Sequence, residues 1–81
     1  MQVSVFSAEY LDSLTAEASA SPRRRQHRNV HVDYGEPVQR LFNAITRASY
    51  IRPHRHGAEP RVETMLGVRG RLSLVLFDET G

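Results

Sequence analysis

The sequence predicts a mainly β fold with one short N-terminal α-helix. Residues 50–56 and 62–66 alternate as the two strands of a hairpin, joined by a connection that contains a glycine and a proline. Residues 71–77 alternate as a further strand, and both of its faces are apolar, which is typical of a strand covered on both sides. Apolar residues at near-helical spacing follow Ser7, which predicts a capped helix that ends at Pro22.

The length of 81 residues allows one small domain, which we take as residues 1–81. The chain has no cysteine, so disulfides and thiolate metal sites are excluded, and any metal must be held by histidine and carboxylate side chains. It has no stretch of about 18 apolar residues, and its first residues lack the pattern of a signal peptide. We therefore expect a cytoplasmic protein that does not enter the membrane.

A candidate metal site lies on the predicted hairpin. If residues 50–56 are extended, His54 and His56 point to the same face, with their Cβ atoms roughly 7 Å apart. Two imidazoles can converge on one cation, and Glu63 from the next strand can complete the set. These three residues would suit a divalent transition metal: zinc, iron, manganese or nickel. The alternative is an exposed hairpin that binds nothing.

Residues 21–28 form a basic run that includes Arg23, Arg24 and Arg25. One interpretation is a solvated loop. Another is an anion site, because a planar guanidinium can grip phosphate or carboxylate at two points. Nucleic acid is a third, which we do not expect, because the cluster is short and no aromatic residue interleaves it.

The segment after the basic run contains a short strand and a loop in our prediction. Val30–Val32 alternates like a strand, and residues 33–37 are dense in turn formers. His31 lies in this predicted strand. A lone histidine is more often a surface or hydrogen-bonded residue than a metal ligand, so we do not assign His31 to a metal.

Several motifs together resemble the cupin family. His54-x-His56, then Glu63 followed six residues later by Gly70, is similar to the family's first motif. Farther upstream, residues 21–25, 29–31 and 37–44 resemble the WbuC-type cupin metalloproteins, so the likeness spans nearly the whole chain.

The resemblance implies a cupin-like, partial antiparallel β-barrel. It favours a strand over the apolar residues Val38 to Ile45, although their i, i+3, i+4, i+7 spacing by itself indicates a helix. The family's second motif, which closes the barrel and supplies a fourth metal ligand, has no counterpart here, so we expect roughly the N-terminal half of a cupin domain. The candidate residues for substrate or anion binding are Arg23, Arg24, Arg25, His31, Gln39 and Arg52.

Three functions remain open at this stage. The resemblance implies a metal-binding protein of the WbuC type, acting in bacterial surface polysaccharide or nucleotide-sugar metabolism. Such an ion, with an open coordination position, could polarise a substrate oxygen or activate water, so an enzyme is one interpretation. The others are a non-catalytic module that binds an anionic sugar or nucleotide, and a non-functional remnant.

We also expect a homodimer or larger homo-oligomer. A chain of this size buries only about 60% of its unfolded surface, yet residues 71–77 have to be covered on both faces. Pairing of apolar faces or sheet edges between chains would provide that cover.

Overall fold

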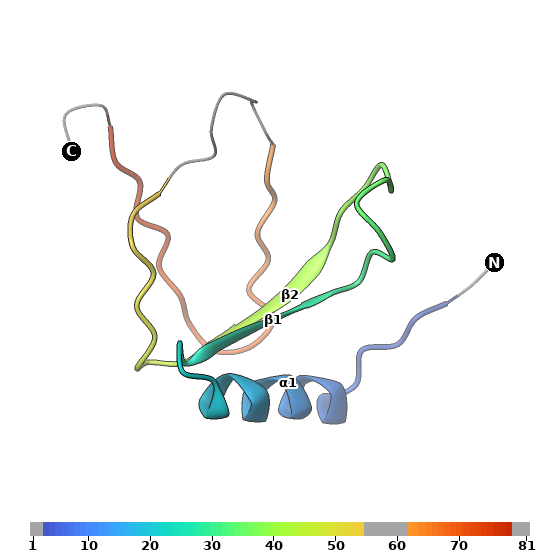
Figure 1. Ribbon diagram of the computed structural model, residues 1–81, viewed down its shortest axis with the longest axis horizontal. Helices are drawn as coiled ribbons and strands as arrows, with labels where there is room; N and C mark the ends of the chain where they lie inside the picture. The colour runs from blue at the N-terminus through green and yellow to red at the C-terminus, as the bar shows by residue number, and fades with distance from the viewer. Residues whose placement is uncertain (1–2, 55–61, 79–81) are drawn as a thin grey trace.

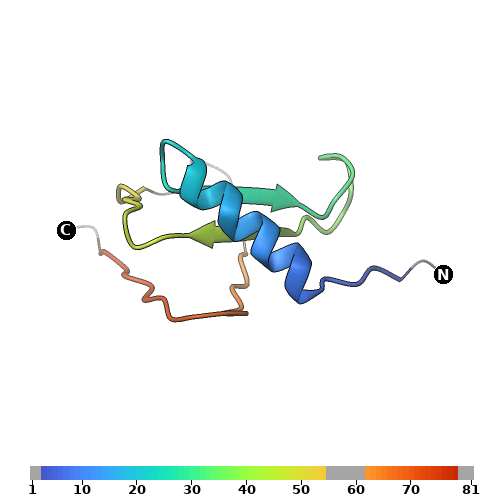
Figure 2. The ribbon, with the colours of Figure 1, turned by 90° about the horizontal axis from the view of Figure 1, so that it is seen from below.

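The computed structural model describes residues 3–54 and 62–78. It contains a helix, α1 (Ala8–Ala20), followed by two strands, β1 (Arg25–Asn29) and β2 (Leu41–Ile45). The strands pair antiparallel, with His27 opposite Asn43 and Arg28 opposite Phe42. The helix packs against both strands and lies along one side of the hairpin in Figure 1, and it crosses the strands in the perpendicular view of Figure 2. None of the helices in the described part of the chain is long and apolar enough to span a membrane.

The N-terminal helix is present where the sequence predicts it. The Ser7 hydroxyl accepts a hydrogen bond from the Tyr10 backbone N–H at 3.2 Å, so it satisfies one of the free donors of the first turn. Glu9 places a negative charge beside the positive end of the helix dipole. At the other end Ser21 is extended (φ −71°, ψ 142°), as expected for a residue before proline, and the helix stops.

A small apolar cluster joins the helix to the hairpin. Leu14 and Ala18, one helical turn apart, are the buried hydrophobic residues of the described chain, with 2% and 0% of their surface exposed. Next to them the rings of Phe6, Tyr10 and Phe42 contact one another, with centroids 4.8 to 5.4 Å apart. Helix and β2 are therefore held together by aromatic contacts at one end and by aliphatic burial at the other.

Strand β1 begins earlier than predicted. It occupies residues 25–29 of the basic run, whereas Val30–Val32, the predicted strand, contributes only hydrogen bonds from the Val30 and His31 backbone N–H groups to the Arg40 carbonyl. The prediction failed because β1 is polar. It is stabilised by pairing with β2 and by the helix on one face, and tertiary context of this kind overrides strand propensity.

Strand β2 and the loop before it agree better with the sequence. Residues 41–45 form a strand, although their apolar spacing alone favours a helix. In the predicted loop, the Asp33 carboxylate accepts a hydrogen bond from the Gly35 N–H at 2.7 Å, which closes a local turn. Residues 41–45 form a strand because each of them pairs with a residue of β1, whereas an isolated helix of this length would lack such support.

The prediction of a mainly β, barrel-like fold is wrong. Strands account for 14% of the described residues and the helix for 19%, and the sheet has two strands. Residues 50–54, 62–66 and 71–77 are described but are not strands, while residues 55–61 lie outside the description. In Figure 1 these later segments rise from the hairpin without joining its sheet. Alternation defines two faces, but a strand also needs a neighbour to receive its backbone hydrogen bonds, and none of the described segments supplies one.

The burial of Leu14 leads to a stability prediction. Leu14→Ala should lower the free energy of unfolding by about 2–5 kcal/mol, because it leaves a cavity between the helix and the hairpin. Urea denaturation followed by circular dichroism measures this change. The control is Leu74→Ala: Leu74 is exposed, so the change should stay within about 0.5 kcal/mol. Equal losses in the two variants would contradict the core described above.

Candidate functional site

The two faces of the hairpin differ in chemistry. Arg28 and Phe42, which are register partners, point toward the helix, where the Arg28 guanidinium lies 4.8 Å from the centre of the Tyr10 ring. Because side chains alternate along a strand, His27, Asn29 and Asn43 share the other face. This face also carries Arg25, Leu41 and Ile45, and it has no helix on it. We call it the open face of the hairpin.

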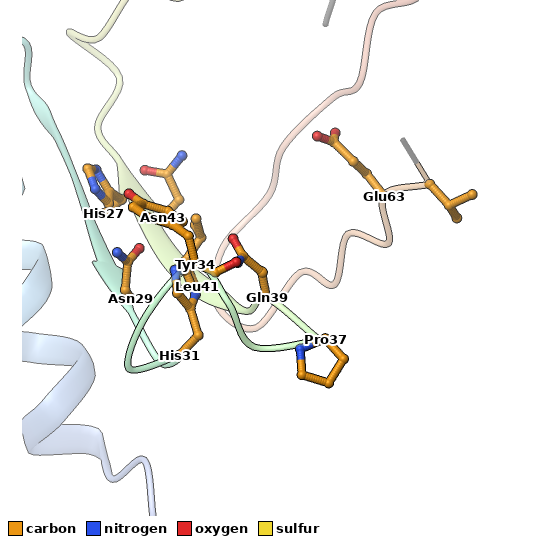
Figure 3. A pocket seen from close by; sticks show the side chains of 10 residues that line it. His27, Asn29, His31, Tyr34, Pro37, Gln39, Leu41, Asn43 and Glu63 are labelled. Carbon is orange, nitrogen blue, oxygen red and sulfur yellow. The ribbon is translucent and has the colours of Figure 1, made fainter. Parts of the chain in front are cut away.

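A hollow lies over the open face and takes further residues from the 30–40 connection and from the segment after residue 61 (Figure 3). Its lining consists of His27, Asn29, His31, Tyr34, Pro37, Gln39, Leu41, Asn43, Val62 and Glu63. Imidazole and carboxamide groups dominate the polar part of this lining. Glu63 is its one carboxylate, and no arginine of the described chain lines it.

His31 is the buried polar residue of the hollow. It is 7% exposed, and its Nδ1 lies 3.0 Å from the backbone carbonyl oxygen of Arg40. A carbonyl can only accept, so Nδ1 must carry the proton and donate it. In the neutral ring, Nε2 is then an acceptor.

That acceptor has no hydrogen-bond partner among the described residues, and its surface is buried. Most buried polar atoms in proteins are paired, and one left unpaired costs about 1–3 kcal/mol. The Tyr34 ring lies against the imidazole, with centroids 5.4 Å apart and planes inclined at 49°. A ring face does not replace a full hydrogen-bond donor, so His31 retains an unmet acceptor at the edge of the hollow.

The connection that carries these residues is held in place locally. The Gln39 side-chain N–H₂ donates to the Tyr34 backbone carbonyl at 2.7 Å, which links the end of the connection to its middle. Both residues line the hollow. The loop therefore presents His31, Tyr34 and Gln39 as one unit.

The structure describes two of the three predicted metal ligands. Glu63 lies in the hollow, and Figure 3 shows it across from the residues of the strands. His54 is exposed and its Nδ1 donates to the Arg52 carbonyl at 3.1 Å. His56 lies outside the described residues. Within residues 3–54 and 62–78, no three histidine, aspartate or glutamate side chains form a group that could hold a metal.

The arginines chosen as candidate anion ligands have separate partners. The Arg24 guanidinium donates to the Ser19 carbonyl near the end of the helix, and Arg25 donates to the Tyr50 carbonyl at 3.0 Å. Arg23 and Arg52 are exposed and do not line the hollow. The structure thus brings together His31, Gln39 and Glu63 from the predicted set, but not the arginines.

Arg28, the last arginine of the basic run, belongs to the helix side. It forms a 2.9 Å ion pair with Glu17, and the hydrogen bond to this carboxylate is the main cause that raises the pKa of Arg28. Both side chains are partly exposed, so the pair orients the helix on β1 more than it stabilises the fold.

Four polar lining residues were missed by the sequence analysis: His27, Asn29, Tyr34 and Asn43. The signal was present as the alternating series His27, Asn29, His31, which puts three polar side chains on one face of an extended segment. It was hidden because the arginines before and within this series made the stretch resemble a solvated loop.

A family model described as "Domain of unknown function (DUF6016)" matches residues 6–81, which is nearly the whole chain. No curated protein and no solved structure matches the chain.

The unmet acceptor of His31 can be tested through stability. His31→Phe keeps a ring of similar size and removes both the Arg40 hydrogen bond and the unpaired nitrogen, so the two effects oppose each other. The Arg40 carbonyl still receives the Val30 N–H at 2.9 Å. We expect the free energy of unfolding to change by less than about 1 kcal/mol, measured by urea denaturation.

A matched control removes a hydrogen bond that is fully used. Ser7→Ala deletes the helix cap and should cost about 1 kcal/mol. A loss well above 2 kcal/mol in His31→Phe would show that Nε2 is satisfied in the folded protein.

Proposed function

This chain belongs to the family described as Domain of unknown function (DUF6016), and we propose that it is a binding module for a small, neutral, hydroxyl-rich ligand such as a sugar. The ligand would lie in the hollow on the open face of the hairpin. The observation that carries the proposal is the lining itself, which is rich in carboxamide and imidazole groups and poor in charge.

The chemistry of the lining supports a ligand with many hydroxyl groups. The side chains of Asn29, Asn43 and Gln39 each offer a donor N–H₂ and an acceptor oxygen. A hydroxyl group both donates and accepts, so several of them can pair with such a surface without leaving either side unmet. Asn29 and Asn43 lie on neighbouring strands of one sheet, which fixes their separation through the register.

The charge of the lining favours a neutral ligand over a phosphate. Phosphate sites usually contain arginine, lysine or a helix N-terminus. Here the arginines are elsewhere, and Glu63 would repel an anion. An anionic sugar or nucleotide is therefore the less favoured ligand for this hollow, unless its charged part lies outside.

A divalent transition metal held by His54, His56 and Glu63 is a separate hypothesis, supported by the spacing of these residues in the sequence. The described residues alone do not form such a site, so we derive no reaction from it. A role in surface polysaccharide metabolism, as in the WbuC-type cupins, would agree with a sugar ligand and rests on the sequence resemblance.

The proposed ligand class can be tested by calorimetric titration with glucose, galactose and mannose, and with their 6-phosphates. We expect at least one neutral sugar to bind, and its phosphate to bind no better. Asn43→Leu should weaken that binding about three- to tenfold, since it removes a carboxamide from the open face.

Gln26→Leu is the control for this variant. It removes the same chemical group from β1, but on the face that carries Arg28, so the affinity should not change. The proposal fails if none of the neutral sugars binds, or if the two variants weaken binding equally.

Metal content provides a further test. His54→Ala should reduce the divalent metal retained by the purified protein, whereas His27→Ala should not, because His27 is not one of the three predicted ligands. Glu63→Gln should also lower it, because it removes the anionic ligand. Elemental analysis of untagged protein measures the content, and equal retention in all three variants would exclude the site.

A further inference from the structure

The contact between His31 and Tyr34 supports an inference about which group of the ligand the hollow selects. This inference rests on the proposed function. His31 is buried, its proton is placed on Nδ1 by the Arg40 carbonyl, and Nε2 has no partner within the described chain. Tyr34, by contrast, is 81% exposed although its ring contacts the imidazole. A largely exposed ring thus lies against the imidazole that carries the buried, unpaired acceptor.

We propose that Tyr34 is a movable cover over Nε2 of His31, and that this nitrogen accepts a hydrogen bond from a ligand hydroxyl when the ring moves aside. The acceptor then selects a donor at one end of the hollow, while the carboxamides bind the rest of the ligand. His31 is in this sense the specificity-determining residue of the site.

The attachment of Tyr34 makes this movement feasible. The backbone of Tyr34 is tied by the Gln39 side chain, which bonds to its carbonyl oxygen and leaves the ring unaffected. The phenol ring can therefore swing by side-chain rotation while the loop keeps its shape. The His31 ring cannot swing in the same way, because the Arg40 carbonyl holds it.

The tautomer is tested first, without any ligand. Nitrogen-15 NMR of histidine-labelled protein should show that in the neutral ring of His31 the proton is on Nδ1 and Nε2 is unprotonated. A protonated Nε2 in the neutral ring would overturn the proposal, because no acceptor would then be present.

The cover is tested by chemical modification with diethyl pyrocarbonate, which acylates accessible, unprotonated imidazole nitrogens. His27, which is exposed, serves as the internal reference. In the wild-type protein, His31 should react with the reagent at least several-fold more slowly than His27. Tyr34→Ala should raise the His31 rate toward that of His27, as followed by peptide mass spectrometry.

Tyr50→Ala is the matched control, because Tyr50 is also exposed but does not line the hollow. It should leave the His31 rate unchanged. If Tyr34→Ala does not accelerate the reaction of His31, or if Tyr50→Ala accelerates it equally, the proposed cover is wrong.

The ligand is then introduced as a mixture of glucose, galactose and mannose. In Tyr34→Ala the mixture should slow the modification of His31 and leave that of His54 unchanged. Acceleration by Tyr34→Ala without protection by the sugars would refute the proposed ligand class but support His31 as a covered acceptor, so the two failures are distinguishable.

Discussion

The packing of α1 on one face of the β1–β2 hairpin is the constraint on which the rest of the structure depends. An isolated two-stranded hairpin is marginal in water, and so is a helix of 13 residues. Each therefore needs the other, through Leu14 and Ala18 and through the ring contacts of Tyr10 with Phe42. Because the helix covers one face, the opposite face is available for polar residues that serve no packing role.

This division explains why the basic run is not an anion site in the structure. Arg28 faces the helix, where it pairs with Glu17 and lies over the Tyr10 ring. Arg24 donates to a carbonyl near the end of the helix, and Arg25 donates to the carbonyl of Tyr50. Planar guanidinium groups with several donors suit such structural roles. The residues on either side of Arg28, His27 and Asn29, lie on the other face and contribute to the hollow.

The elements that could be predicted from sequence are those with local causes. The helix follows from the Ser7 cap, the spacing of Leu14 and Ala18, and the stop before Pro22, all of which act within a few residues. Strand β2 needed more than periodicity, because only its pairing with β1 decides between helix and strand. The polar strand β1 was missed, since its support comes from a helix and a strand that a local pattern does not contain.

The prediction of a barrel failed because a local strand pattern was present but no neighbouring strand in the described chain pairs with it. The alternation of residues 71–77 predicts a strand with two apolar faces, but the segment is not a strand, and Leu72, Leu74 and Leu76 are exposed. In the site, His31 and Gln39, predicted for substrate or anion binding, and Glu63, predicted as a metal ligand, line one hollow. The pairing that adds Asn43 to it depends on the register of the sheet.

The central claim is that the face of the hairpin opposite the helix is the ligand surface. Nuclear Overhauser effects between the protons of a bound neutral sugar and the protein test it most directly. The account predicts contacts from the sugar to the side-chain amides of Asn29 and Asn43, and none to Tyr10 or Glu17 on the helix side. Contacts confined to the helix side, or to the exposed segment 71–77, would contradict it.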